Sequence, residues 1–202
     1  MLMEANSGSS ARRAQIVAAA IEVIADAGYA KASFARIARQ AGLSSTGMIS
    51  YHFAGKDDLM REVVAEVARV AEAYVRPRIE AQGTPSGRLR AFIEASVEVI
   101  AAYPKHMPAL VEVLTHLRDD DPSRHDLVST QVAAMDVQVE RMREAQQAGA
   151  FREFDPRVMV TAIRGAIDSA VVRAAKDPDF DAVAWGRELA DTFDLATRRA
   201  DR

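Results

Sequence analysis

The stretch from Ser33 to Lys56, SFARIARQAGLSSTGMISYHFAGK, most constrains the fold of this chain. Apolar residues recur at helical spacing up to Ala41, and Gly42 then breaks the pattern. The hydroxyl residues that follow can cap a second, short helix over 46–51. Two short helices joined by a glycine-containing turn predict a helix-turn-helix, whose second helix enters the DNA major groove.

The rest of the chain favours helices throughout. Hydrophobic residues make up 49% of the sequence, no stretch alternates with period two, and the prolines fall between helical patterns. We therefore predict an all-α protein of about nine helices. An N-terminal arm and three-helix domain occupy residues 1–56, and a helical body occupies 57–202. Local signals place the first helix start at Ser9 or Ser10, and Pro77 bends or ends the helix that follows Asp57.

Composition excludes several classes of protein. With no cysteine there is no disulfide framework and no thiolate chemistry, which fits the cytoplasm. No apolar run approaches the roughly 20 residues of a membrane-spanning helix. Residues 1–56 hold six basic and three acidic residues, or +3, so the net charge of −3 leaves −6 on the remainder. A basic N-terminal part on an acidic body suits a protein that meets phosphate with one end.

No catalytic or metal-binding pattern emerges. The chain has no glycine-rich phosphate loop, no G-x-S-x-G elbow and no H-E-x-x-H. His106 and His116 are ten residues apart and fall on different sides of a helix. We expect no enzyme, no metal and no cofactor.

The N-terminal sequence also contains a more specific series of motifs. Residues 12–53 read RRAQIVAAAIEVIADAGYAKASFARIARQAGLSSTGMISYHF and are followed by AGKDDL. Their order and spacing closely resemble the N-terminal domain of TetR-family transcriptional regulators. Two departures stand out. The segment between Gly42 and Phe53 is one residue longer than the commonest family pattern, which leaves the register across 45–47 open. Ser50 stands where the family usually has Tyr, and Tyr51 follows it.

The resemblance implies a mechanism. A homodimer, paired through its two C-terminal helices, would place two recognition helices in successive major grooves of a near-palindromic operator. A small hydrophobic or aromatic effector bound in the helical body would release a repressor from that operator. Two other classes stay open: a helical protein-interaction domain, and a small-molecule-binding or catalytic domain without DNA function.

Candidate residues follow from residue type and position, except that Lys56 is a phosphate contact implied by the resemblance to the TetR family. Hydroxyls can bond base edges, cations can meet phosphates, and a glycine lets a helix seat close to the duplex, whereas Met48, Ile49 and Phe53 pack inward. The DNA-binding candidates are Arg12, Arg13, Ser33, Ser44, Ser45, Thr46, Gly47, Ser50, Tyr51, His52 and Lys56. The ligand-binding candidates, each of which also fits a core position, are Phe92, Tyr103, His106, Met107, Leu110, Met135, Val139, Met142 and Ile163. Small and aromatic residues of the last two helices form the candidate dimer interface: Ala162, Gly165, Ala166, Ser169, Ala170, Trp185, Leu189 and Phe193.

Overall fold

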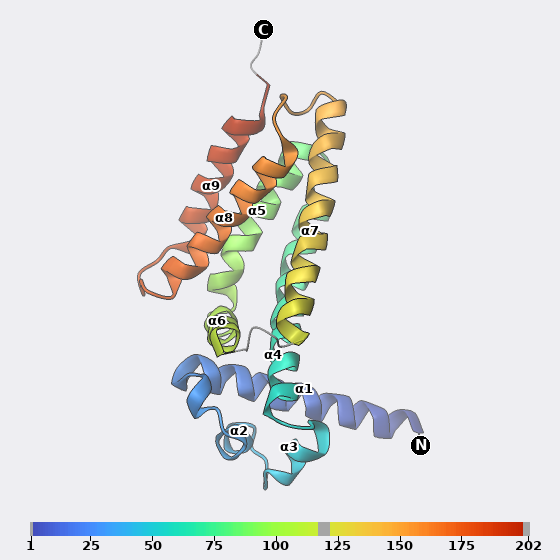
Figure 1. The fold of residues 1–202 in the computed structure, drawn as a ribbon, viewed down its shortest axis with the longest axis vertical. Coiled ribbons are helices and arrows are strands. Elements are labelled where there is room, and N and C mark those ends of the chain that lie inside the picture. Colours follow the sequence, from blue (N-terminus) through green and yellow to red (C-terminus); the bar gives the residue numbers. More distant parts are fainter. Residues whose placement is uncertain (1, 117–121, 200–202) are drawn as a thin grey trace. The chain divides into compact units, whose positions relative to one another are not determined.

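The computed structural model describes the backbone of residues 2–116 and 122–199, and the side chains within those ranges except at 2–7 and 122–128. The described residues confirm the all-α prediction, since they form nine α-helices, one 3-10 helix and no strand (Figure 1). In chain order the elements are α1 (Leu2–Ala27), η1 (Tyr29–Lys31), α2 (Phe34–Gln40), α3 (Gly47–His52), α4 (Lys56–Glu80), α5 (Pro85–Ala102), α6 (His106–His116), α7 (Pro122–Gln147), α8 (Pro156–Ala174) and α9 (Ala182–Thr197).

These elements form two compact units. The first unit contains α1, η1, α2, α3, the part of α4 up to Val70, and α6. The second contains the rest of α4 with α5, α7, α8 and α9. The first unit thus differs from the domain predicted over 1–56. The first unit extends along α4 beyond residue 56 because Leu59, Met60 and Val63 of that helix are buried. It also includes α6, because that helix packs on α1.

The helix-turn-helix forms where the sequence predicts it. Ser33 caps α2, with its hydroxyl accepting a hydrogen bond from the backbone N–H of Arg36. Gly42 follows the helix with a φ of 66°, in the left-handed region that glycine favours. Leu43 then donates its N–H to the carbonyl of Ala38 at 2.8 Å. This closure satisfies an end carbonyl of α2 and turns the chain toward α3.

Three local expectations were wrong. Helix α1 begins at Leu2, so Ser9 and Ser10 lie inside it; residues 2–10 contain no proline to interrupt the helix, and a single glycine costs only about 1 kcal/mol. Thr46 is the N-cap of α3 but its side chain makes no capping bond, because its backbone is helical (φ −68°, ψ −19°) rather than extended. Of the two effects predicted for Pro77, an end of the helix is wrong, because Pro77 lies inside α4 and its carbonyl still accepts a hydrogen bond from the backbone N–H of Ala81.

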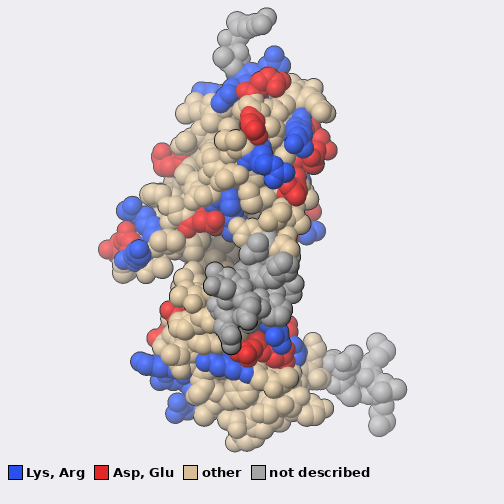
Figure 2. Space-filling view, in the orientation of Figure 1, with Lys and Arg blue, Asp and Glu red and all other residues tan. Residues whose placement is uncertain are grey.

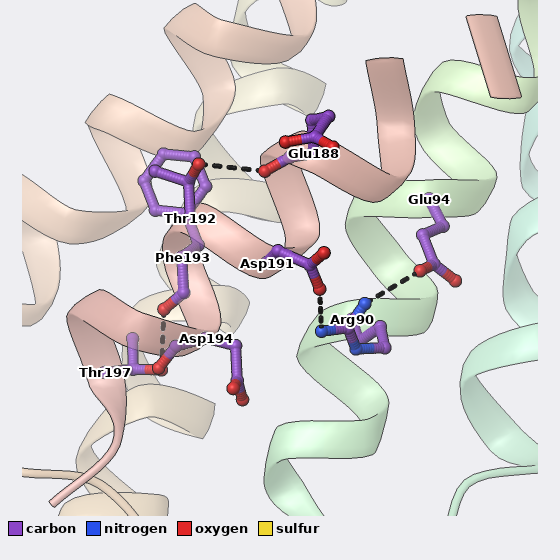
Figure 3. A network of polar contacts seen from close by, with 8 residues as sticks. All are labelled: Arg90, Glu94, Glu188, Asp191, Thr192, Phe193, Asp194 and Thr197. Carbon is purple, nitrogen blue, oxygen red and sulfur yellow. Dashed lines mark hydrogen bonds and ion pairs between the residues drawn. The ribbon is translucent and has the colours of Figure 1, made fainter. Parts of the chain in front are cut away.

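In the second unit, α5 packs most extensively on α9. Gly186 of α9 permits this approach, since a Cβ there would lie 3.4 Å from the backbone of Glu94 on α5. Figure 3 shows Arg90 of α5 reaching both Glu94 of its own helix and Asp191 of α9, with N–O distances of 3.1 and 2.5 Å. In the same view, Thr192 and Thr197 bond back to carbonyls of their own helix. Apolar packing therefore holds the pair, and the partly exposed ion pairs add little.

Aspartate caps start the last two helices. Asp155 accepts hydrogen bonds from two backbone N–H groups at the start of α8, and Asp181 accepts one at the start of α9. Aspartate is a favoured N-cap residue, and proline at the first helical position after Asp155 suits a helix start, so both starts follow from local sequence. Across the described residues, no helix combines the length and apolar character that crossing a bilayer would require.

Candidate functional site

Helix α3 and the three residues before it present an uncharged polar surface. Ser44, Ser45, Thr46, Gly47 and Ser50 are all exposed. The side chain of Tyr51 is 81% exposed, the most open of the large apolar side chains described. Figure 2 shows that the end of the first unit carrying α2 and α3 is largely free of charge in that view, with basic side chains to one side. Such a surface can approach a base edge without bringing in a carboxylate.

Two apolar residues fix α3 in the first unit. Ile49 is fully buried and Phe53, directly after the helix, is 2% exposed, as the sequence predicts. Met48 differs from its inward prediction and is 37% exposed, because Ile49 alone faces the core along this short helix. The six residues of α3 therefore divide into a buried side, which Ile49 provides, and an exposed side.

Arg13 holds the end of α3 instead of facing outward. Its guanidinium donates to the backbone carbonyl of His52 at 2.7 Å and pairs with Glu62 of α4 at 2.5 Å. The same group lies 4.4 Å from the centroid of the Phe53 ring. These three contacts give Arg13 a structural role that its place in the sequence does not indicate. The ring of His52 is half-buried and lies edge-on to Tyr51, 5.1 Å between centroids.

Other cations lie on the elements that precede α3 in the first unit. Arg12 is half-buried and bonds to Gln15. Lys31, Arg36 and Arg39, on η1 and α2, form no ion pair among the residues that the structure describes. Sequence reasoning left these three out, although the placement of Arg36 and Arg39 on the first helix of the motif could have indicated them. Lys56, by contrast, has its ammonium bound to Tyr29.

The turn between α3 and α4 is held by Asp58. Its carboxylate accepts a hydrogen bond from the backbone N–H of Ala54 at 3.0 Å. That bond is the main reason why the pKa of Asp58 lies below its ordinary value, and Arg61 lowers it further. The arrangement fixes the step from the end of α3 to the start of α4.

A separate pocket lies in the second unit, with a volume of about 510 Å³. It is built where the end of α4, the start of α5 and the last turns of α7 meet. Its lining is Ile79, Glu80, Pro85, Arg88, Leu89, Phe92, Gln138, Arg141, Met142, Glu144, Ala145, Ala148 and Phe151. The volume falls in the range of small-molecule sites. The lining residues of α7 repeat at helical spacing from Gln138 to Ala145, a pattern that the sequence shows but that core packing explains equally well.

Only two predicted ligand residues, Phe92 and Met142, line this pocket. Val139 and Ile163 are buried in the core of the second unit, and Met135 is half-buried away from the lining. Tyr103 packs edge-on against Tyr74, with centroids 6.0 Å apart. His106, Met107 and Leu110 belong to α6 in the first unit, so they are not part of this pocket. Periodicity marked apolar helix faces but not which faces leave a space between them.

The predicted dimer residues fall into three groups. Ala162, Gly165 and Ser169 are exposed on α8, whereas Ala166 is half-buried. Ala170 is fully buried within the chain and has no exposed surface to offer a partner. On α9, Trp185, Leu189 and Phe193 are half-buried. Three large apolar residues of the same two helices are open: Val158 of α8 at 65%, Val172 of α8 at 54% and Leu195 of α9 at 60%.

Two family models match the chain. Residues 16–63 match the model described as bacterial regulatory proteins of the tetR family. Residues 82–172 match a C-terminal domain described as tetracyclin repressor-like. The first match contains the whole helix-turn-helix, and the second contains α5, α6 and α7.

Among curated relatives, the HTH-type transcriptional regulator BetI 1 of Chromohalobacter salexigens is 36% identical over 88 residues, or 43% of this chain and 43% of the relative. The chain thus spans less than half the length of the curated relatives it matches. Among solved structures, FadR of Bacillus subtilis with stearoyl-CoA has a TM-score of 0.71 at 23% identity, covering 88% of this chain and 95% of that one. AibR with isovaleryl coenzyme A and operator DNA has a TM-score of 0.71 at 20% identity, covering 92% and 97%. These structures share the fold, and with both family models matched, the chain belongs to the TetR family of bacterial regulatory proteins.

Proposed function

We propose that the protein is a DNA-binding transcriptional regulator, a dimeric repressor that a small hydrophobic or aromatic ligand releases from a near-palindromic operator. The observation that carries this is the exposed surface formed by the hydroxyl residues at 44–46, directly before α3, and by Ser50 and Tyr51 on α3, a helix anchored by Ile49. The AibR relative of similar fold is described in complex with operator DNA. The proposal gives the chain no catalytic role, and it places the protein with chromosomal DNA in the cytoplasm.

The proposed contacts divide by chemistry. Ser45, Thr46 and Ser50 can bond base edges, and Gly47 leaves room for the duplex to approach. Tyr51 and the hydroxyls of Ser33 and Ser44 can meet phosphates. Arg36 and Arg39 join Arg12 as cations that can neutralise phosphate, since neither is held in an ion pair within the described residues.

The proposed effector site is the pocket of the second unit. Leu89, Phe92 and Phe151 supply an apolar wall, and Arg88 and Arg141 stand among the polar residues around it. The FadR and AibR relatives are described with coenzyme A thioesters. An apolar pocket with a few polar groups fits a ligand that has a hydrophobic part.

The proposed dimer uses the open face of α8 and α9. Exposed Gly165 and Ala162 permit close helix approach, and Val158, Val172 and Leu195 would lose their exposure on pairing. A two-fold pair of subunits would present two copies of α3, to be spaced about 34–36 Å apart for successive major grooves.

Selection of bound fragments from genomic DNA, followed by affinity measurements over a range of salt concentrations, tests the proposal. Phosphate neutralisation makes the logarithm of the association constant fall linearly with that of salt, with a slope of about 0.9 for each phosphate contacted. We expect a steep slope for the parent, weaker binding for Tyr51→Ala, and a smaller slope for Arg39→Ala. Arg143→Ala, an exposed arginine on α7, is the matched control and should bind like the parent.

No selected fragment, or binding that Tyr51→Ala and Arg39→Ala leave unchanged, would overturn the proposal. Weak salt dependence with capture of a protein partner would instead favour the interaction-domain alternative. Once an operator is found, hydrophobic compounds that release it can be screened against the same fragment.

A further inference from the structure

One lysine at the start of α4 is bound within the protein. The Nζ of Lys56 donates a hydrogen bond to the backbone carbonyl of Tyr29 at 2.9 Å, and it lies 3.9 Å from the centroid of the Tyr29 ring. Burial lowers the pKa of Lys56, and the carboxylate of Asp57 opposes that effect. A cation at a helix N-terminus also opposes the helix dipole. The hydrogen bond to the carbonyl and the contact with the aromatic ring offset the cost of burying the ammonium and the cost of placing it at the positive end of the helix dipole. These contacts therefore hold the Lys56 side chain against Tyr29.

Tyr29 in turn connects to α6. Its backbone N–H donates to the carboxylate of Glu112 at 3.0 Å, and its ring stacks on that of His116, with centroids 4.7 Å apart and planes 12° from parallel. The Nδ1 of His116 lies 2.8 Å from the carbonyl of Glu112. Gly28 before it has a φ of 83°, which turns the chain out of α1 and presents Tyr29 to both helices. We call Tyr29, Lys56, Glu112 and His116 the Tyr29 cluster.

Only residues 53–55 separate Lys56 of the cluster from the helix that would read DNA. Helix α3 ends at His52 and α4 begins at Lys56, and the turn between them is closed by the bond from Ala54 to Asp58. Arg13 fixes the His52 side of the same turn. A restraint on Lys56 is therefore a restraint on where α3 ends.

We propose that Lys56 is a positioning residue, which ties the start of α4 to η1 and, through Tyr29, to α6, rather than a contact to operator phosphate. The inference rests on the proposed function, because its effect is read as DNA affinity. It reassigns a residue that resemblance to the family places at the DNA. It also makes α6 part of the framework that holds α3.

The experiment compares Lys56→Gln, Tyr29→Leu and the double variant for operator binding over a range of salt. A positioning role predicts that each single variant loses about tenfold in affinity, as for residues coupled by direct contact, with the parent's salt slope retained. The double variant should bind no more weakly than the weaker single one. Lys56→Arg, which keeps the charge over the ring, should recover part of the loss.

A phosphate contact predicts the opposite pattern. Lys56→Gln would then reduce the salt slope by about 0.9 for each lysine removed, Tyr29→Leu would have no effect, and the two changes would be additive. That result, or parent-like binding by both single variants, would overturn the inference.

Failure of the proposed function can be told apart from failure of this inference. If the parent binds no DNA, the proposed function fails, whereas the cluster can still be tested by urea unfolding of the same four proteins. Energetic coupling between positions 56 and 29 would support the restraint, and additive losses would exclude it. Should Tyr29→Leu not fold, His116→Ala replaces it in the same comparison, because it removes the ring that stacks on Tyr29 and leaves Tyr29 in place.

Discussion

His106 is the first residue of α6, and its imidazole is half-buried. Burial lowers the pKa of His106 from 6.5, with a smaller opposing effect from the carboxylate of Glu66. Because the folded state disfavours the charged form, this histidine contributes stability that is complete above the unfolded pKa and is lost as pH falls through the lowered folded value. We expect the free energy of unfolding to decrease from about pH 6.5 downward, before most carboxylates titrate.

Urea unfolding of the parent and of His106→Gln between about pH 7.5 and pH 5 checks this expectation. The variant should show the smaller decrease across that interval. Equal decreases for the two proteins would show that His106 does not contribute to it.

Side-chain roles were the least predictable part of the site. Arg13 and Lys56 look in the sequence like free cations beside a DNA-reading helix, yet both are bound within the first unit. Their partners, a carbonyl at His52 and another at Tyr29, are backbone atoms distant in sequence, which no local pattern indicates. Ser33 was predictable as a cap because its partner lies three residues away.

Gly186 of α9 lies close against α5. A Cβ at Gly186 would lie 3.4 Å from the Cα and carbonyl oxygen of Glu94 and from the Cβ of Val97, which is ordinary contact, and atoms beyond a Cβ would add to the crowding. We expect Gly186→Ala to be tolerated, since alanine favours the helix by up to about 1 kcal/mol. Gly186→Leu should destabilise by about 1–3 kcal/mol through overpacking.

Equilibrium urea unfolding measures both changes. Ala134→Leu provides the comparison, because Ala134 is an exposed residue of α7, outside the proposed dimer interface. If Gly186→Leu were as stable as Ala134→Leu, the close approach of α5 and α9 would not limit side-chain size at Gly186.

The starts of helices and the turns between them were more predictable from the sequence than the roles of single side chains. Helix starts at Asp155 and Asp181 and the turn at Gly42 follow from local chemistry, and each is where the pattern indicates. The errors concern Ser9, Thr46 and Pro77, where neighbouring turns decide whether a capping or breaking residue takes effect. The pocket was missed because a space arises from the packing of three helices, and periodicity describes one helix at a time.

For the whole molecule, the proposed dimer can be tested by charge. Gly165→Arg places a cation in the middle of the open small-residue face of α8, where an apolar interface could not accommodate it. We expect a monomer in analytical ultracentrifugation, an unchanged helical circular dichroism spectrum, and a large loss of operator affinity.

Val137→Arg on α7, where the parent side chain is 51% exposed, is the control and should remain dimeric. A dimeric Gly165→Arg variant would place the interface elsewhere on the chain.

The order of the elements along the chain has a practical consequence for exchanging parts between relatives. Helix α6 packs on α1, although the whole of α5 lies between it and α4 in sequence. A fragment cut anywhere between α4 and α6 would leave the partners of Ala109 and Val113 facing water. A chimaera meant to transfer operator specificity must therefore carry two separate pieces of the gene, one that encodes α1 to α4 and one that encodes α6. Recombination at a single crossover would pair α1 of one parent with α6 of the other, whose contacting side chains need not fit.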